Sequence, residues 1–343
     1  AALTGENEFN GNVAFTGSGD AVVDIRVAGT LFVQKSLYGN ANITLVKKGV
    51  GTLQHSEGYA PLNAGETAYT EARDKTDGYY PNRKFVFKGV KLQKGVLDMR
   101  QYYWIWNCDF QFDGDGAGLS VNKLTANLGV NSLELSGCKF RETVNVAGTS
   151  HYVTANDPTC YIHFMGTMED TSFSGLFKGS AGICWDPVNG ATFTFRKGVS
   201  PTTGILAVSN GTIRVAEGAG FTALSCVTVS GANSRFKVDA DAIRSIPAPF
   251  VLDNGGKIAV PAGIGVSVAA LVVDGTSVGA GLYNGQAGLN GTTVGWIDGA
   301  GYVVVTGNTE GARADATWTG TGGVQTPENW NGATELPALN GAT

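Results

Sequence analysis

The sequence is poor in charge and in proline. Charged residues make up 15% of its 343 residues, against about 25% in an average soluble domain. It has 10 prolines, and its 50 glycines follow no strict triplet period, which excludes a collagen-like protein and a proline-rich linker. The formal net charge is −5 and no cluster of Lys and Arg offsets it, so a nucleic-acid partner is not expected.

Long apolar runs and metal-binding motifs are also missing. No apolar segment reaches the roughly 18–20 residues that a membrane-spanning helix needs, so no such segment is expected. The sequence has three histidines, without a His-Glu-x-x-His motif or a paired-cysteine spacing, which argues against a zinc site. A Gly-x-Ser-x-Gly elbow, a phosphate-binding loop and a dinucleotide fingerprint are absent as well. The sequence therefore indicates no particular reaction.

The cysteines are too few and too widely spaced for the disulfide framework of a small secreted domain. They are an odd number, five, so at least one thiol is expected to be free. We interpret them as small apolar residues packed inside the fold. One disulfide, such as Cys160 to Cys184, is the alternative. The five are Cys108, Cys138, Cys160, Cys184 and Cys226.

A repeated strand signature is the most informative feature of the chain. Thr212-Ile213-Arg214-Val215 is echoed by Arg235-Phe236-Lys237-Val238 and by Lys257-Ile258-Ala259-Val260, each after a turn rich in Asn, Ser or Gly. The intervals from Ile213 to Phe236 to Ile258 are 23 and 22 positions. Alternating strands at a fixed period of this size predict the stacked coils of a β-solenoid, in which each coil buries its inner face against its neighbours.

A second echo predicts one strand in four successive coils. It combines a turn residue, a small inward residue, a polar outward residue and a large inward residue. Cys108 and Cys138 would then form an interior ladder. The four segments are Gly89–Leu92, Asn107–Phe110, Gly137–Phe140 and Asp170–Phe173.

Two regions resemble a known family. The string Lys47-Lys48-Gly49-Val50-Gly51-Thr52-Leu53, the later segment Lys91–Asp98 and the C-terminal segments Val266–Gly275 and Trp296–Val305 are similar to the autotransporter-associated β-strand repeat of large secreted bacterial surface proteins. The resemblance implies an all-β fold, a right-handed single-stranded parallel β-helix, in a secreted or cell-surface protein. The first residues look like the product of signal-peptide cleavage behind a small-residue site, which agrees with secretion.

We expect a β-helix over residues 1–306 with polar loop insertions at 54–84 and 141–190. Residues 307–343 are less regular, with Trp-Thr-Gly and Asn-Trp steps that resemble the opening of a further unit in the same family. This tail is interpreted as a linker or as the start of such a unit. Long loops that interrupt a regular stack are where binding or catalytic residues concentrate.

An aromatic cluster is the main candidate for ligand binding. Alternation places Tyr102, Trp104 and Trp106 on one face of a strand. Exposed, the three rings would stack on sugar rings or anchor another protein. Facing inward, they would form a bulky core layer, and the sequence leaves both alternatives open.

Calcium is the one cofactor for which the sequence offers candidate ligands. Asp113 and Asp115 lie in an Asp-Gly-Asp-Gly segment, and hard cations prefer several carboxylate oxygens. Asp and Gly are also the residues that a tight turn between coils needs. The turn is the preferred interpretation, so no cofactor is expected.

Catalysis is the less favoured hypothesis. Glycoside hydrolysis needs two carboxylates about 5–9.5 Å apart, which on a β-helix means Asp or Glu at matching positions of adjacent coils. A polysaccharide lyase needs a base beside a cation. The candidates for either reaction are Lys139, Glu142 and His163.

The sequence thus favours a non-enzymatic structural or adhesive protein that presents a stiff, weakly charged surface. Its expected partners are other copies of itself, surface-layer proteins or carbohydrate, because open coil ends recruit strands. The main alternative is a carbohydrate-active enzyme, a polysaccharide lyase or glycoside hydrolase. A trimeric phage-tail fibre or spike segment is a further alternative.

Overall fold

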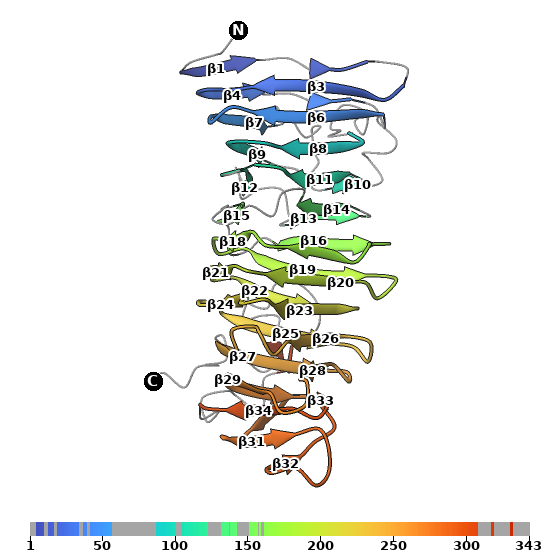
Figure 1. Ribbon diagram of the computed structural model, residues 1–343, viewed down its shortest axis with the longest axis vertical. Coiled ribbons are helices and arrows are strands. Elements are labelled where there is room, and N and C mark those ends of the chain that lie inside the picture. Colours follow the sequence, from blue (N-terminus) through green and yellow to red (C-terminus); the bar gives the residue numbers. More distant parts are fainter. Residues whose placement is uncertain are drawn as a thin grey trace. The chain divides into compact units, whose positions relative to one another are not determined.

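The computed structural model describes most of the chain. The described residues are 5–9, 13–16, 19–33, 37–39, 42–56, 87–100, 104–106, 108–114, 116–122, 132–136, 138–142, 151–156, 158, 161–307, 317–318 and 330–331. Within these ranges every regular element is a β-strand, and none is a helix. Most strands pair in parallel with the corresponding strand of the next coil (Figure 1). The predicted all-β, single-stranded parallel β-helix is therefore confirmed.

The chain divides into two compact units. The N-terminal unit comprises residues 1–164 and 175–178, and the C-terminal unit comprises 165–174 and 179–343. Strands of the first are β1 (Glu6–Phe9), β2 (Val13–Ala14), β3 (Ala21–Arg26), β4 (Thr30–Val33), β5 (Leu37–Tyr38), β6 (Ile43–Lys48), β7 (Thr52–Ser56), β8 (Gly89–Leu92), β9 (Val96–Arg100), β10 (Trp104–Trp106), β11 (Asp109–Phe112), β12 (Gly118–Asn122), β13 (Ser132–Ser136), β14 (Lys139–Glu142), β15 (Tyr152–Ala155) and β18 (Leu176–Lys178).

The remaining strands belong to the C-terminal unit, apart from β16 (Tyr161–Gly166), which contributes residues to both. They are β17 (Thr171–Phe173), β19 (Gly182–Pro187), β20 (Thr192–Arg196), β21 (Val199–Ser200), β22 (Ile205–Val208), β23 (Thr212–Ala216), β24 (Gly220–Phe221), β25 (Cys226–Ser230), β26 (Arg235–Val238), β27 (Ser245–Asp253), β28 (Lys257–Ala259), β29 (Gly265–Val273), β30 (Thr276–Val278), β31 (Gly281–Asn284), β32 (Thr292–Thr293), β33 (Ile297–Asp298), β34 (Tyr302–Val305), β35 (Thr317–Trp318) and β36 (Trp330–Asn331).

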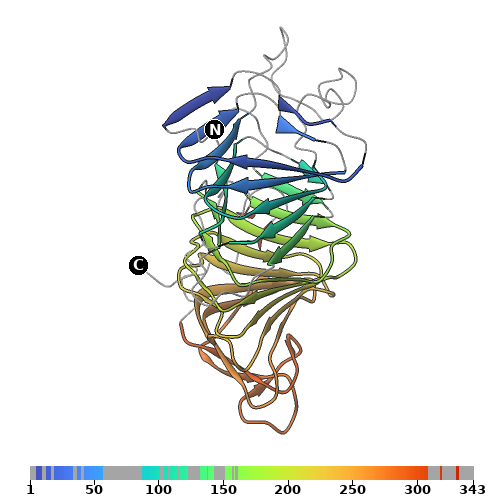
Figure 2. The same ribbon diagram turned by 45° about the horizontal axis from the view of Figure 1, so that its top comes forward.

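Two parallel sheets shape the N-terminal unit (Figure 2). A five-stranded sheet has the order β14-β11-β8-β6-β3, and a seven-stranded sheet has the order β1-β4-β7-β9-β12-β15-β18. Side chains alternate between the interior and the outside, as strand geometry requires. In the seven-stranded sheet Leu53, Leu97 and Leu119 lie in register and are fully buried. Such columns of like side chains form the core of the unit.

The C-terminal unit contains a six-stranded parallel sheet of the order β17-β20-β23-β26-β28-β33. Ile213 pairs in register with Phe236, and Phe236 pairs with Ile258. This is the register that the 23- and 22-residue intervals predict. All three side chains are buried, and the ring of Phe236 packs edge-on against Phe250 at 5.2 Å between centroids. The repeat is therefore a column of interior apolar residues, one from each coil.

The last strands of this unit fold back on the stack. Strand β34 pairs in parallel with β29 on one side and antiparallel with β31 on the other. Strand β29 also forms an antiparallel hairpin with β30. A parallel edge that pairs with an antiparallel strand is closed to further coils of the same direction. Beyond residue 307 the described strands β35 and β36 form a short antiparallel pair.

The string that carries the family resemblance builds a turn between coils. Lys47 occupies an inward position of β6, in register with Ile25 and Leu92. Its ammonium donates hydrogen bonds to the carbonyls of Lys48, Gly49 and Lys94 at 3.2, 2.9 and 2.9 Å. The turn carbonyls thus solvate a charge that has no access to water, because Lys47 is 0% exposed.

The glycines of the same string are required by close contacts between coils. A Cβ at position 51 would lie 1.9 Å from the carbonyl oxygen of Gly29 in the preceding coil. At position 49 the backbone φ is 79°, and a Cβ would lie 2.3 Å from the carbonyl oxygen of Val27. Only glycine has both the conformational freedom and the absence of a side chain that these positions need.

Described strands overlap both of the predicted loop insertions. Gln54 and His55 open the predicted insertion at 54–84 but belong to β7, and the His55 ring accepts a 2.9 Å hydrogen bond from the backbone N–H of Leu37. Residues 57–86 lie outside the described part of the chain. Within the predicted insertion at 141–190, strands β15 to β19 are regular members of the coils.

The second echo predicts one of its three strand pairings correctly and the other two incorrectly. Asp109 pairs with Lys139, so Cys108 and Cys138 are neighbours in adjacent coils as predicted. Gly89 pairs with Asp109, two residues away from the predicted partner. The segment Asp170–Phe173 contributes β17, which pairs with β20 in the six-stranded sheet and not with β14.

Candidate functional site

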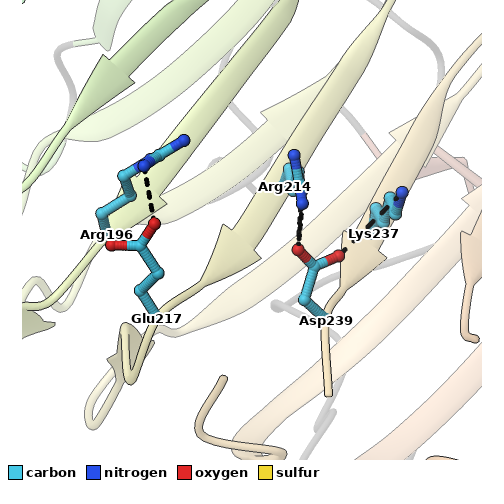
Figure 3. A network of polar contacts seen from close by, with 5 residues as sticks. All are labelled: Arg196, Arg214, Glu217, Lys237 and Asp239. Carbon is cyan, nitrogen blue, oxygen red and sulfur yellow. Dashed lines mark hydrogen bonds and ion pairs between the residues drawn. The ribbon is translucent and has the colours of Figure 1, made fainter. Parts of the chain in front are cut away.

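The outward face of the six-stranded sheet carries a ladder of ion pairs, which we call the charged ladder (Figure 3). Arg196 of β20 contacts Glu217 at 2.6 Å. Arg214 of β23 donates from Nε to a carboxylate oxygen of Asp239 at 2.7 Å, and Lys237 of β26 approaches the other oxygen at 4.0 Å. The hydrogen bond that Arg214 donates to Asp239 raises the pKa of Arg214, which stays charged.

One further rung joins more distant parts of the chain. Arg235 contacts Asp298 at 2.9 Å across the intervening strand β28. Exposed ion pairs of this kind contribute about 0–1 kcal/mol each. The charged ladder therefore contributes less to stability than to the character of the surface. Three of its pairs, Arg196 with Glu217, Arg214 with Asp239 and Arg235 with Asp298, bridge coils, whereas Lys237 and Asp239 belong to the same coil. Sequence reasoning missed these pairs.

A polar column on the outward side of the seven-stranded sheet is buried. Gln54, Asp98 and Ser120 lie in register on β7, β9 and β12. They alternate with the interior leucines, yet they are only 9%, 5% and 8% exposed. A carboxamide, a carboxylate and a hydroxyl are therefore held one coil apart, about 4.8 Å. Sequence reasoning also missed this column, because alternation predicts outward polar residues without predicting their burial.

The predicted catalytic residues belong to two sheets. Lys139 is half-buried and pairs in register with Asp109. The backbone of Glu142 ends the same strand, β14, in register with Phe112. His163 is half-buried in β16, outside the five-stranded sheet. A catalytic role for these residues stays a prediction.

The predicted aromatic cluster is described in part. Tyr102 lies outside the described residues. Trp104 and Trp106 flank Ile105 in β10, and Ile105 pairs in register with the fully buried Leu135. Binding of a glycan or a protein through the two tryptophans stays a prediction.

The candidate calcium ligand Asp113 has other partners. Its carboxylate contacts the Lys91 ammonium at 2.8 Å and accepts a hydrogen bond from Gln93 Nε2 at 3.1 Å. Asp115 lies outside the described residues. The described ranges contain no group of three or more His, Cys, Asp or Glu side chains that could hold a metal ion. The structure thus gives Asp113 a role in joining coils.

Three cysteines are interior residues, as expected. Cys108, Cys138 and Cys226 are buried free thiols. Burial raises the pKa of Cys138 and of Cys226 to about 12. It also raises the pKa of Cys108, with further contributions from Cys138 and Asp109. The thiolate is the reactive form, so these groups are inert at neutral pH.

The remaining described cysteine is also free, as the preferred interpretation expects and unlike the alternative of a disulfide between Cys160 and Cys184. Cys184 is a half-buried free thiol whose Sγ lies 4.0 Å from the Oγ of Ser209. Its proposed partner Cys160 lies outside the described residues.

Two stacked carboxylates form a site that sequence reasoning missed. Asp253 ends β27, and Asp274 follows β29 in the next coil, where its N–H donates to the carbonyl of Leu252 at 2.8 Å. Burial raises the pKa of Asp253, and the charge of Asp274 raises it further. Asp274 Oδ1 also accepts a 3.0 Å hydrogen bond from the N–H of Asn254. The pair meets the requirement of carboxylates at matching positions of adjacent coils.

No family model matches the chain, and neither a curated protein nor a solved structure matches it. The fold therefore defines its class, which is that of the parallel β-solenoid proteins. In the described part of the chain no helix is both long and apolar enough to cross a membrane.

Proposed function

We propose that the protein is a non-enzymatic structural or adhesive β-helix protein, secreted or exposed at the cell surface. It presents a stiff surface for assembly with other copies or surface-layer proteins, or for attachment to glycans. The observation that carries the proposal is the set of ion pairs that bridge coils on the outer faces, such as Lys48 with Asp24 in the N-terminal unit and Arg214 with Asp239 in the C-terminal unit. Their regular spacing suits a repetitive surface better than a single catalytic centre.

Two further observations support this role. The predicted catalytic residues Lys139 and Glu142 belong to β14 of the five-stranded sheet, whereas His163 belongs to β16 in another sheet. The resemblance of residues 47–53 to the autotransporter-associated repeat supports a secreted or surface location. In such a protein the lysine and glycines of that string hold coils together, and the outer faces are free to diversify.

Electron microscopy and multi-angle light scattering test the proposal over a range of protein concentrations. We expect filaments or lateral assemblies, or retention of the monomer on bacterial cell walls and purified glycans. A stable trimer without further assembly would favour the spike alternative. A monomer that binds no surface, glycan or second copy would contradict the proposal.

A glycoside hydrolase is the second candidate, favoured by the stacked pair Asp253 and Asp274. In that case Asp253, with its raised pKa, would be the general acid and Asp274 the nucleophile or base. Release of reducing sugar from a panel of neutral and acidic glycans tests this candidate. Asp253→Asn and Asp274→Asn should then abolish the release, whereas the exposed Asp241→Asn is the matched control.

A further inference from the structure

The outer face of the five-stranded sheet carries more cations than carboxylates, although the whole chain is acidic at −5. We call this surface the basic face. It consists of the outward residues of β3, β6, β8, β11 and β14 and of the turns that flank these strands. Its described charged residues are seven cations, Arg26, Lys48, Lys88, Lys91, Lys94, Lys139 and Arg141, and four carboxylates, Asp20, Asp24, Asp109 and Asp113. The described charges therefore leave an excess of three positive charges.

The charges repeat at the spacing of the coils. Lys91 and Arg141 occupy one column with Gln111 between them, and Arg26 pairs with Lys48 in a second column. Successive positions in such a column are about 4.8 Å apart. The first column also contains Asp24 and Val46, ahead of Lys91. A linear polymer with one charged group on each sugar could therefore meet two cations along either column, two coils apart in the first and one coil apart in the second.

Each of the four carboxylates on this face pairs with a cation. Lys91 with Asp113 is the least exposed pair, at 31% and 13%, and Lys88 with Asp20 is the most exposed, at 50% and 73%. The other two pairs are also exposed. Lys48 contacts Asp24 at 2.5 Å with side chains 30% and 51% exposed, and Arg141 contacts Asp109 at 3.3 Å with side chains 49% and 40% exposed. Ion pairs this exposed are worth about 0–1 kcal/mol, so a carboxylate of a ligand can replace the internal partner at little cost.

The other outward side chains limit the choice of ligand. The accessible ones are small, aliphatic or amide residues, namely Val22, Thr44 and Gln111. Neutral sugars and single-stranded nucleic acids are bound mainly by stacking on aromatic rings, and these described positions offer none. The net charge of the chain also repels a dense phosphate backbone.

We propose that the basic face binds a linear acidic polysaccharide whose carboxylate or sulfate groups pair with cations of successive coils. The proposal rests on the attachment role proposed above and names the chemistry of the partner. Binding is electrostatic and involves no covalent step, so it weakens steeply as salt rises.

Affinity electrophoresis and calorimetry with polygalacturonate test the proposal, with neutral dextran and single-stranded DNA as comparison probes. The test variant combines Arg26→Gln, Lys94→Gln and Arg141→Gln, all at exposed positions. The matched control combines Lys197→Gln, Arg244→Gln and Lys257→Gln in the C-terminal unit, with the same change in net charge. We expect the first variant to bind polygalacturonate about tenfold more weakly or worse, and the control to change affinity less than about twofold. Unchanged thermal midpoints show that both variants are folded.

Equal weakening in both variants would overturn the proposal, because the effect would then follow net charge alone. It would also be overturned by no binding of polygalacturonate at low salt, by equal binding of dextran, or by tighter binding of DNA. If the protein still assembles or attaches to neutral glycans in those cases, the proposed function stands without this partner. Cleavage of polygalacturonate would instead contradict the non-enzymatic function itself.

Discussion

The ammonium of Lys47 donates a 2.9 Å hydrogen bond to the carbonyl of Lys94, in the turn of the next coil. The aliphatic stem of Lys47 lies in the interior column between Ile25 and Leu92. One side chain thus fills the apolar core of its own coil and binds the backbone of two turns. A lysine that is fully buried in this way acts as a clamp between coils, which gives the first position of the family-like string a structural purpose.

Replacement of Lys47 by methionine keeps the volume and removes the clamp. The carbonyls of Gly49 and Lys94 lose a charged donor, while the cost of burying a charge disappears. Hydrogen bonds to charged groups are worth about 1.5–3 kcal/mol each, so we expect a net destabilisation of about 1–3 kcal/mol. Urea denaturation followed by circular dichroism measures this change. The control is Lys48→Met at the partly exposed neighbouring position, where we expect a destabilisation of less than about 0.5 kcal/mol. An equal loss of stability in both variants would contradict the role of Lys47 as a clamp.

The pH dependence of stability gives an independent signature of the same residue. Burial lowers the pKa of Lys47 from 10.5 to about 8. Between these values the unfolded chain holds the proton and the folded chain has released it, so the free energy of unfolding rises with pH. Relative to the Lys47→Met variant, the wild type should gain up to about 3 kcal/mol between pH 8 and pH 10.5. Comparison of the two proteins cancels the opposite effect of the buried cysteines. Parallel pH profiles would show that Lys47 titrates normally.

A methyl group at Gly51 should be far more harmful than a typical Gly→Ala change. Its Cβ would lie 1.9 Å from the Gly29 carbonyl oxygen, which already accepts a 2.8 Å hydrogen bond from the N–H of Thr52. The coils would have to separate locally, at a cost of about 3 kcal/mol or more. Gly265→Ala is the control, because nothing lies within 4 Å of a Cβ there. Thermal midpoints should fall sharply for the first variant and stay equal or rise for the second.

The fold could be predicted from the sequence because the repetition of the coils produces local sequence patterns. The interval between Ile213 and Phe236 predicted their register correctly, since successive coils differ in length by one residue, 23 and then 22. The echo that begins at Gly89 was placed two residues away from its true partner Asp109. A pattern with a period of two is unchanged by a slip of two residues, so alternation alone cannot detect this error.

The candidate surfaces were less predictable, because they depend on which coils become neighbours. The outward position of Arg235 follows from alternation, but its partner Asp298 is 63 residues away. The proximity of Asp253 and Asp274 depends on how their two strands align, which the sequence alone does not show. The low exposure of Asp98 depends on how other segments pack over that face, which a strand pattern does not encode.

Thiol labelling distinguishes interior cysteines from accessible ones. Cys108 and Cys138 are fully buried in adjacent coils, and their raised pKa values keep them protonated, so neither should react with a thiol reagent at pH 8. Cys184 is partly exposed and should react within minutes. Peptide mapping after labelling with iodoacetamide, with and without urea, assigns each modification to its residue. Cys184→Ser is the control that removes the native-state signal from that peptide. Labelling of Cys138 in the folded protein would mean that the coils open locally at this point, and the interior column would then be less tightly closed than its burial indicates.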